Sequence, residues 1–313
     1  LALVLARNHH QVYLWDINLE MIREMKLVRY NRKYLPEIKI PKNVFPIEGV
    51  KEVPAEIKKI ISAVPCHALR SSLNFLKPLS IGSICIACKG FEPDTQKLNH
   101  KVIEEEINNC SIAVLSGPSF AKEVAAGLPT AITIASKDIK IAQDFSSLFH
   151  SDIFRTYVHS DYIGVQIAGA VKNVMAIAAG ISDGLGFGSN ARSALITRGL
   201  AEIIRLGISI GAKQETFLGL AGLGDLILTC TDNQSRNRRL GLLLAEGLSV
   251  KQAREKINQE IEGLNTAKEV GALAKKNKIE MPITEQVINV IESKCSAKDA
   301  VQNLLNREQK IEA

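Results

Sequence analysis

One lysine stands in the middle of an otherwise apolar helical pattern. Residues 165–181 read VQIAGAVKNVMAIAAGI, and Lys172 and Asn173 are the only strongly polar residues of the central run 167–181. Burying an ammonium group without a partner is costly or lowers its pKa, so such a lysine is either paired structurally or used as an acid or base. Small neighbours such as Gly169 and Ala176 would let a ligand approach and favour the second interpretation. A lysine that extends to the surface is the alternative.

A second group of chemically competent residues lies in the glycine-rich segment 219–241, GLAGLGDLILTCTDNQSRNRRLG. Its glycines predict a tight turn that presents Asp225, and a polar run then leads into a new helix near Ser235. Free N–H groups at a helix start, with Arg236 and Asn237 in the first turn, are suited to a phosphate. An ordinary capped helix with a solvated basic face is the alternative.

Two weaker motifs follow predicted strands. Lys89-Gly90 comes after the run at 83–88, and Gly117-Pro118-Ser119 comes after the run at 111–116. Ligands of parallel sheets gather at such strand ends, although turns there are often glycine-rich for geometric reasons alone.

Short apolar runs alternate with amphipathic patterns in the first half of the chain. We predict helices between most of these runs, at 66–77, 94–107 and 138–149. Alternating strands and helices predict a mainly parallel sheet covered on both faces. The predicted strands are 11–16, 60–65, 83–88, 111–116, 130–135 and 153–158.

The second half contains long helical patterns and no convincing strand. The patterns cover 161–181, 191–210, 235–246, 249–258, 265–277 and 283–293. We therefore predict an α/β dinucleotide-binding (Rossmann-type) domain at 1–160 and an all-α domain at 161–313.

The α/β pattern opens on a helix, at residues 1–8, rather than on a strand. The run QVYLWD then resembles the second strand of a dinucleotide fold, whose terminal acid, here Asp16, bonds the ribose hydroxyls. In a dinucleotide fold a first strand and a GxGxxG turn come before this helix, and neither is present in the sequence. We therefore expect that both have been lost. A domain that truly begins with the helix is the alternative.

Composition excludes several classes of protein. The 313 residues are 46% hydrophobic and 23% charged, which is typical of globular proteins. The net charge of +6 is scattered and only 5% of residues are aromatic, so nucleic-acid binding is not indicated.

The six cysteines are too few and irregular for a disulfide framework, and Cys85 and Cys88 have no second ligand pair for zinc. No signal peptide or uncharged membrane span is present, so we expect a cytoplasmic protein with no metal.

The chain resembles the bacterial NAD(P)-dependent glycerol-3-phosphate dehydrogenases over essentially all of its length. The resemblance rests on long strings in family order: NRKYLP (31–36), CKG (88–90), SGPSFAKE (116–123), GLPTAI (127–132), GAVKNVMAIAAGISDGLGFGSNAR (169–192), ALITRGLAE (194–202), AGLGDLILTCTDNQSRNRRLG (221–241) and IEGLNTAKEV (261–270). The family joins a dinucleotide-binding domain to a helical one and reversibly reduces dihydroxyacetone phosphate to sn-glycerol 3-phosphate, a precursor of membrane phospholipids.

The resemblance implies a role for individual residues. It makes Lys172 the catalytic proton donor, with Asp225 holding it and Arg236 clamping the substrate phosphate. Substrate contacts are implied for Lys89, Gly117, Ser119, Lys172, Asp225, Ser235, Arg236 and Asn237. Cofactor contacts are implied for Asp16, Ile17, Lys89, Ala121, Arg236, Glu260 and Glu262.

The sequence departs from the family pattern at three places. The glycine-rich turn is missing, which puts cofactor affinity in doubt, and Cys66 replaces a common serine. Asp16 stands near the position where many relatives place Arg or His to bind a 2′-phosphate. Because a carboxylate repels that phosphate and bonds a free 2′-hydroxyl, the sequence favours NAD over NADP.

Two rival functions stay open at this stage. The related β-hydroxyacid dehydrogenases also join such a sheet to a lysine-bearing helical domain, although the phosphate-suited segment 235–237 argues against them. A non-catalytic binding protein would tolerate the loss of the glycine-rich turn. We expect a small phosphorylated substrate, no nucleic acid and no membrane insertion; whether the chain forms a homodimer is left open.

Overall fold

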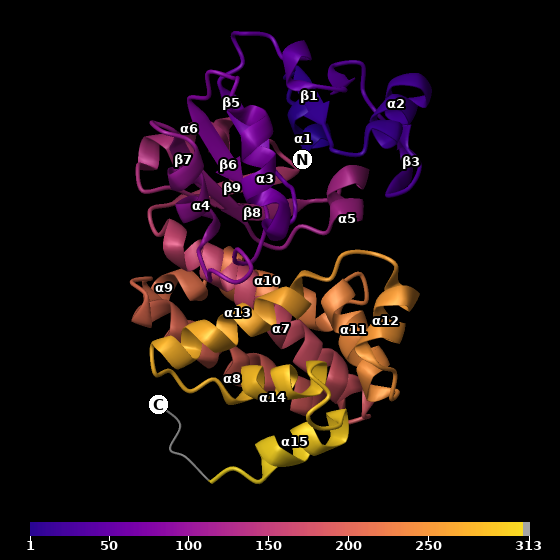
Figure 1. Cartoon of the computed structure of the whole chain (residues 1–313), viewed down its shortest axis with the longest axis vertical. Helices are drawn as coiled ribbons and strands as arrows, with labels where there is room; N and C mark the ends of the chain where they lie inside the picture. Colours follow the sequence, from indigo (N-terminus) through magenta and orange to yellow (C-terminus); the bar gives the residue numbers. More distant parts are fainter. Residues whose placement is uncertain (309–313) are drawn as a thin grey trace. The chain divides into compact units, whose positions relative to one another are not determined.

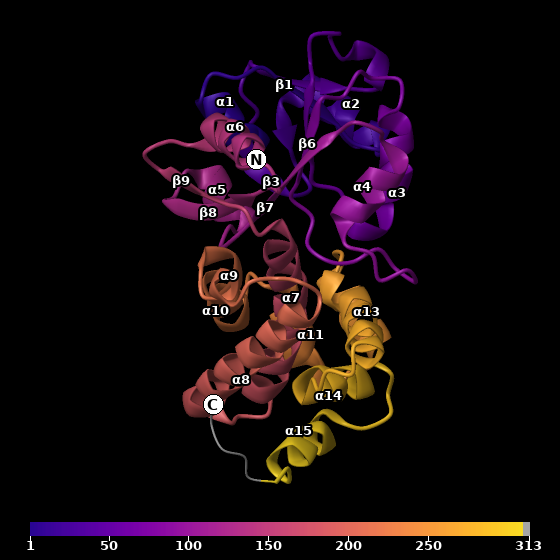
Figure 2. The same cartoon turned by 90° about the vertical axis from the view of Figure 1, so that its left-hand side faces the viewer.

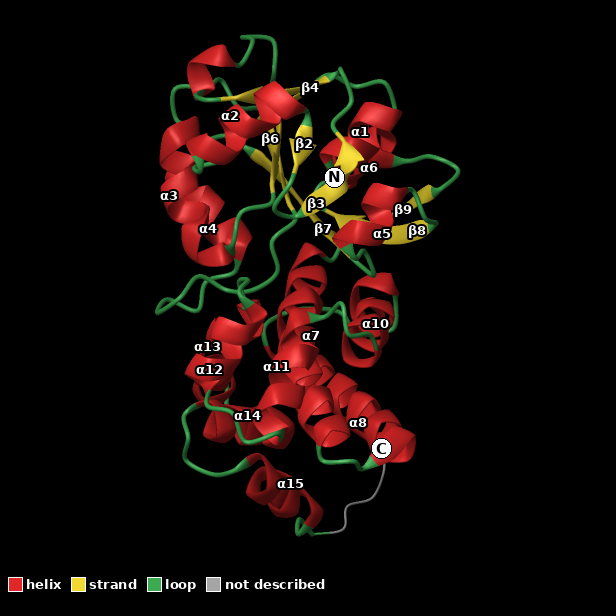
Figure 3. Ribbon diagram, turned by 90° about the vertical axis from the view of Figure 1, so that its right-hand side faces the viewer, coloured by secondary structure: helices red, strands yellow, loops and turns green. Residues whose placement is uncertain are grey.

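The computed structural model describes residues 1–308, which form two compact units. The first comprises Leu1–Val64, Ala68–Cys88 and His100–Tyr162. The second comprises Pro65–His67, Lys89–Asn99 and the chain from Ile163 onward. Lys89 therefore belongs with the helical part of the chain, although it follows a strand of the first unit. Figure 3 shows that the strands all lie in the first unit and that the second is helical.

A five-stranded sheet forms the centre of the first unit, in the order β5-β6-β7-β8-β9. Three of its four pairs are parallel, as the alternating pattern predicts, and β7 and β8 run antiparallel. The helix between these two strands, α5 (Ala121–Ala126), packs on α1 and β3, so it does not serve as a crossover helix on the sheet. The strands are β5 (Lys59–Ser62), β6 (Ser83–Ile86), β7 (Ser111–Ser116), β8 (Thr130–Ala135) and β9 (Phe154–His159).

Two smaller sheets precede it. The predicted second strand, β1 (Val12–Trp15), pairs in parallel with β4 (Val44–Ile47), and β2 (Tyr30–Asn31) forms an antiparallel hairpin with β3 (Leu35–Lys39). Strands β2, β3 and β4 were not predicted from the sequence. Pro46 explains why β4 is hard to detect, because proline is confined to the margins of sheets.

Helices cover both faces of the five-stranded sheet. Side chains of α1 (Ala2–Arg7) and α6 (Ile139–Phe149) share a buried cluster with Cys85 and Ile132. On the other side, α3 (Cys66–Leu76) and α4 (Asn99–Glu106) bury Leu69, Leu73, Val102 and Ile103. Figure 2 shows the two pairs of helices on opposite sides of β6, and α2 (Leu19–Val28) lies beside β4. The predicted two-sided cover is thus confirmed.

The second unit is a helical bundle around α7 (Tyr162–Gly184). Every residue of α7 from Gly164 to Ser182 is buried. Figure 1 shows α7 among the other helices of this unit. This helix is long and apolar enough to cross a membrane, but 94% of its most apolar window lies inside the protein. It is therefore a core helix. The helices around it are α8 (Gly188–Ser209), α9 (Gln214–Phe217), α10 (Asp225–Thr231), α11 (Arg236–Ala245), α12 (Val250–Ile257), α13 (Glu262–Lys276), α14 (Pro282–Ile291) and α15 (Ala297–Leu305).

The long helical patterns predicted for the second half are confirmed, with differences of a few residues at their ends. The short helices α9, α10 and α15 were not predicted, because α9 and α10 are too short to show a clear period and α15 lies beyond the last predicted pattern. The predicted first strand and its glycine-rich turn would lie before Leu1 and stay a prediction.

Helices α7 and α11 approach so closely that their backbones touch. A Cβ atom on Gly241 would lie 2.1 Å from the carbonyl oxygen of Ile177, and one on Gly180 would lie 2.1 Å from that of Arg238. Only glycine fits at these positions without separating the helices. The start of α11 is thereby fixed against the helix that carries Lys172.

We predict that Gly241→Ala lowers the free energy of unfolding by about 1–3 kcal/mol, because its methyl group overpacks the α7–α11 contact. Urea denaturation measures this change. Gly219→Ala is the matched control, since its Cβ would meet nothing closer than 3.5 Å. Equal stability of the two variants would contradict the close contact.

Candidate active site

Lys172 points from the middle of α7 to a carboxylate at the start of α10. Its side chain donates hydrogen bonds to Oδ1 of Asp225 at 2.6 Å and to Oγ1 of Thr229 at 2.8 Å. Lys172 is 6% exposed and Asp225 is 1% exposed. Thr229 lies one helical turn after Asp225, so both partners come from the same face of α10. The ammonium is thus fixed in position within the protein interior.

The same carboxylate binds a second cation. Lys89 donates to Oδ2 of Asp225 at 2.5 Å, so one buried acid bridges two lysines. The side chain of Lys89 keeps 17% of its surface exposed. With two cations on one anion, the cluster carries a net positive charge, which suits an anionic ligand.

Burial dominates the titration of Lys172. Loss of hydration lowers the pKa of Lys172 from 10.5 to about 8; the positive charge of Lys89 adds to this effect, and Asp225 opposes it. Burial alone would raise the pKa of Asp225, but Lys172 and Lys89 outweigh burial and hold that pKa below its usual value. The carboxylate therefore stays ionised while the neighbouring amine exchanges a proton near neutral pH.

A wide helical turn positions Asp225. Residues Leu220–Gly224 form a π-helical turn directly ahead of α10. A Cβ on Gly222 would lie 2.1 Å from the carbonyl oxygen of Phe217, so the turn needs glycine there. The predicted glycine-rich turn that presents Asp225 is confirmed, and its form belongs to a class that is frequent at functional sites.

Asn237 joins the start of α11 to two other helices. Its Nδ2 donates to Oδ1 of Asn173 at 2.9 Å, and its Oδ1 accepts a hydrogen bond from the N–H of Gly263 at 3.0 Å. Asn173 in turn donates to Glu262 at 3.4 Å. Since Asn173 follows Lys172, this network places the first turn of α11 beside the catalytic candidate.

Charged residues gather around Glu262. Burial raises the pKa of this carboxyl group, and the positive charges of Arg236, Lys89 and Lys172 act in the opposite direction. These interactions bring together four residues that the sequence analysis assigned to the site. Ser235, also predicted, caps α11 by accepting a hydrogen bond from the N–H of Arg238 at 3.2 Å.

Lys89 begins a short hairpin that is tied to α13. Phe91 and Leu98 pair across the hairpin, and Phe91 is buried in the hydrophobic core of the helical unit. Glu269 accepts hydrogen bonds from the N–H of Asp94 at 3.0 Å and from Nε2 of Gln96 at 2.9 Å. These contacts hold the turn of the hairpin on α13, and Lys89 at its start meets Asp225.

The remaining predicted residues belong to other segments of the chain. Gly117, Ser119 and Ala121 follow β7 in the first unit, and Asp16 and Ile17 follow β1. Oδ1 of Asp16 accepts a hydrogen bond from the N–H of Asn18 at 2.8 Å, so the acid also shapes the turn after its strand. Glu260, in the second unit, precedes α13.

The sequence analysis did not assign Thr229 or Asn173 to the site. Thr229 could have been found from its position four residues after Asp225, which places both on one helix face. Asn173 stood out as polar beside Lys172, but nothing in its local sequence indicates a partner 64 residues away.

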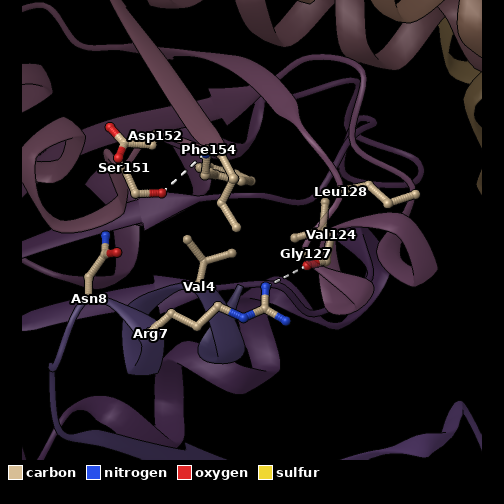
Figure 4. A pocket seen from close by; sticks show the side chains of 10 residues that line it. Val4, Arg7, Asn8, Val124, Gly127, Leu128, Ser151, Asp152 and Phe154 are labelled. Carbon is tan, nitrogen blue, oxygen red and sulfur yellow. Dashed lines mark hydrogen bonds between the residues drawn. The ribbon is translucent and has the colours of Figure 1, made fainter.

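A pocket of about 250 Å³ in the first unit contains none of these residues. It lies among α1, α5 and the start of β9, and Arg7 projects along its wall (Figure 4). The guanidinium of Arg7 donates to the carbonyl oxygens of Val124 and Ala125, at the end of α5. Its charge therefore caps a helix.

A sheet-based unit, a helical unit and a buried lysine–aspartate pair define the class of two-domain nicotinamide-dependent dehydrogenases. Residues 1–142 match the family "NAD-dependent glycerol-3-phosphate dehydrogenase N-terminus", and residues 161–302 match "NAD-dependent glycerol-3-phosphate dehydrogenase C-terminus". The chain belongs to the NAD(P)-dependent glycerol-3-phosphate dehydrogenase family. Its α/β NAD-binding domain and helical C-terminal domain are those of the family, as predicted.

Similar proteins cover the whole chain. The glycerol-3-phosphate dehydrogenase [NAD(P)+] of Bartonella henselae is 49% identical over 100% of this chain and 93% of its own length. That of Pseudoalteromonas translucida is 50% identical over 100% of this chain and 94% of its own length. The crystal structure of glycerol-3-phosphate dehydrogenase from Coxiella burnetii is 46% identical, covers 98% of this chain and 95% of its own, and superimposes with a TM-score of 0.94.

We predict that Asp225→Asn lowers the pKa of Lys172 below its wild-type value of about 8, because the variant removes the charge that opposes burial and Lys89. NMR titration of the lysine side chains without substrate measures both values. Asp299→Asn, which removes an exposed carboxylate at the start of α15, is the control. A Lys172 midpoint at the ordinary 10.5 in wild type would contradict the account.

Proposed function

We propose that this chain reduces dihydroxyacetone phosphate to sn-glycerol 3-phosphate, reversibly, with Lys172 as the proton donor. One observation carries the proposal: a buried ammonium is held by Asp225 and Thr229. Burial lowers the pKa of this group from 10.5 to about 8. An acid with a pKa near the working pH is suited to donate a proton to one substrate and recover it from another. The family membership supplies the substrate class.

The residues present fit a nicotinamide dinucleotide. Asp16 directly follows strand β1 of the α/β unit, at the position where ribose hydroxyls bind in such folds, and Lys89 and Arg236 provide cations for phosphate oxygens. When bound, the cofactor supplies a hydride to the ketone carbon. Ile17, Ala121, Glu260 and Glu262 are the further cofactor contacts that we propose, and NAD is the form that Asp16 favours.

Proton transfer falls to Lys172. As negative charge develops on the ketone oxygen, the ammonium donates its proton to that oxygen and becomes a neutral amine. Asp225 keeps its charge throughout, because Lys89 remains beside it, and so it holds the amine in place. Thr229 accepts a second hydrogen bond from the Lys172 nitrogen and so restrains its orientation.

The start of α11 provides the phosphate site in this proposal. Ser235, Arg236 and Asn237 combine a helix N-terminus, a guanidinium and an amide near Lys172. Binding the phosphate there would fix the ketone by interactions remote from the reacting carbon. Lys89, Gly117 and Ser119 are further substrate contacts. In this scheme residues 1–160 bind the cofactor, residues 161–313 carry catalysis, and the product supplies glycerophospholipid synthesis in the cytoplasm.

Sheet topology supports the proposal that residues 1–160 do not include the first strand of the dinucleotide fold. In such folds the strand order is 3-2-1-4-5-6, so strand 1 lies between strands 2 and 4. Here β1 and β4 correspond to strands 2 and 3, and β5 corresponds to strand 4. In the first unit, β1 and β5 belong to separate sheets. Strand 1 of the dinucleotide fold would lie between these two strands.

We predict that Lys172→Met lowers kcat for dihydroxyacetone phosphate reduction by at least about 100-fold, because general acid catalysis contributes on that order or more. Steady-state assays with NADH measure the loss. Met keeps the length and apolar packing of the side chain, and Lys251→Ala, at an exposed lysine of α12, is the control. A Lys172→Met enzyme with a tenth of wild-type kcat would overturn the assignment.

We also predict a higher kcat/KM with NADH than with NADPH, because the Asp16 carboxylate repels a 2′-phosphate. Asp16→Asn should reduce the difference by removing that charge while keeping an acceptor for the bond from the N–H of Asn18. Asp152→Asn, in the loop before β9, is the control. A clear wild-type preference for NADPH would contradict this prediction.

A further inference from the structure

We propose that Arg238 is a positioning residue that holds the phosphate-binding start of α11 in place and thereby sets the selectivity for a phosphorylated ketone. The inference rests on the proposed function, because it names the residue that shapes the proposed phosphate site. Arg238 is the third residue of α11 and is buried, and its guanidinium bonds to α7, α10 and the loop between α10 and α11.

The guanidinium of Arg238 uses each of its three nitrogens. Nε donates to the carbonyl oxygen of Cys230 at 3.1 Å, and Nη2 donates to Oδ2 of Asp183 at 2.5 Å. Nη1 donates to Oδ1 of Asn233. These three acceptors are bonded by three different nitrogens of one planar group, and a lysine, whose donors all lie on one nitrogen, does not reproduce that geometry.

These three acceptors belong to different parts of the site. Asp183 lies at the end of α7, the helix of Lys172, and Cys230 lies near the end of α10, the helix of Asp225. Asn233 lies in the loop between α10 and α11. One side chain of α11 therefore joins the two helices of the lysine–aspartate pair to the loop that leads into Ser235.

The backbone of Arg238 adds to this arrangement. Its N–H donates to the capping oxygen of Ser235, and its carbonyl oxygen lies beside Gly180 of α7. The loop is closed further by a hydrogen bond from the N–H of Ser235 to the carbonyl oxygen of Asp232 at 3.1 Å. The positions of Arg236 and Asn237 are set by these contacts on both sides.

Asp183 provides a comparison within the same network. Its Oδ2 also accepts a hydrogen bond from Nη1 of Arg192 at 2.8 Å, but Arg192 lies on α8 and its side chain is 27% exposed. Arg192 makes no described bond to α10, α11 or their loop. Altering Arg192 therefore perturbs the shared carboxylate without releasing the start of α11.

The test compares Arg238→Lys with Arg192→Lys on two ketones, dihydroxyacetone phosphate and unphosphorylated dihydroxyacetone. A misplacement of about 1 Å in a positioning group costs on the order of 100-fold. Arg238→Lys should lower kcat/KM for the phosphorylated ketone by about that factor, mostly through KM. Its kcat/KM for dihydroxyacetone should stay near wild type, and Arg192→Lys should leave the ratio of the two substrates unchanged.

Three results would overturn the proposal. Equal losses for both ketones would show a general structural role for Arg238, and no loss for either would show that the fork is dispensable. The third result is measured by calorimetry. If Arg238→Lys bound inorganic phosphate as tightly as the wild-type protein does, the proposed role of Arg238 would be wrong, whichever ketone the enzyme reduces. If the wild-type protein bound inorganic phosphate but did not reduce dihydroxyacetone phosphate, the proposed function would be wrong. Weaker phosphate binding by Arg238→Lys would still support the role of Arg238 in that case.

Discussion

A buried ion pair between Lys172 and Asp225 lies at the centre of the helical unit, and the segments around it are arranged to hold it. Removing two charges from water is expensive, and their attraction compensates only where hydrogen bonds satisfy both groups. Thr229 and Lys89 supply those bonds. Apolar residues of similar volume would stabilise the fold equally well. The pair is therefore better explained by a role in catalysis than by a contribution to the free energy of unfolding.

Much of the surrounding packing serves to hold that pair. Backbone contact at Gly180 and Gly241 fixes α11 against α7, and the glycine turn ahead of α10 presents Asp225 to the same helix. The hairpin that carries Lys89 is tied to α13 through Glu269. Three segments distant in sequence, at Lys89, Lys172 and Asp225–Thr229, thus meet at one carboxylate, and their two lysines give the cluster a positive charge that suits a phosphorylated ligand.

Local patterns predicted the parts of the fold that have a clear period. Strands β5 to β9 and the long helices were predicted because their apolar residues repeat regularly, and Lys172 was found because it interrupts such a run. The hairpin of β2 and β3 was missed because Pro36 and Glu37 break the alternation. Arg238 and Glu269 were missed for another reason. Their partners lie 55 and 175 residues away, and no local rule encodes a contact at that distance.

The central claim is that Lys172 acts as an acid with a pKa of about 8. The most direct test is the pH dependence of kcat/KM for dihydroxyacetone phosphate reduction, which reports ionisations of the free enzyme. Because the protonated amine is the active form in this direction, kcat/KM should be constant below the pKa and fall about tenfold per pH unit above it. The rate of the reverse reaction should rise over the same range. A reduction profile that stays flat to pH 10 would contradict the claim.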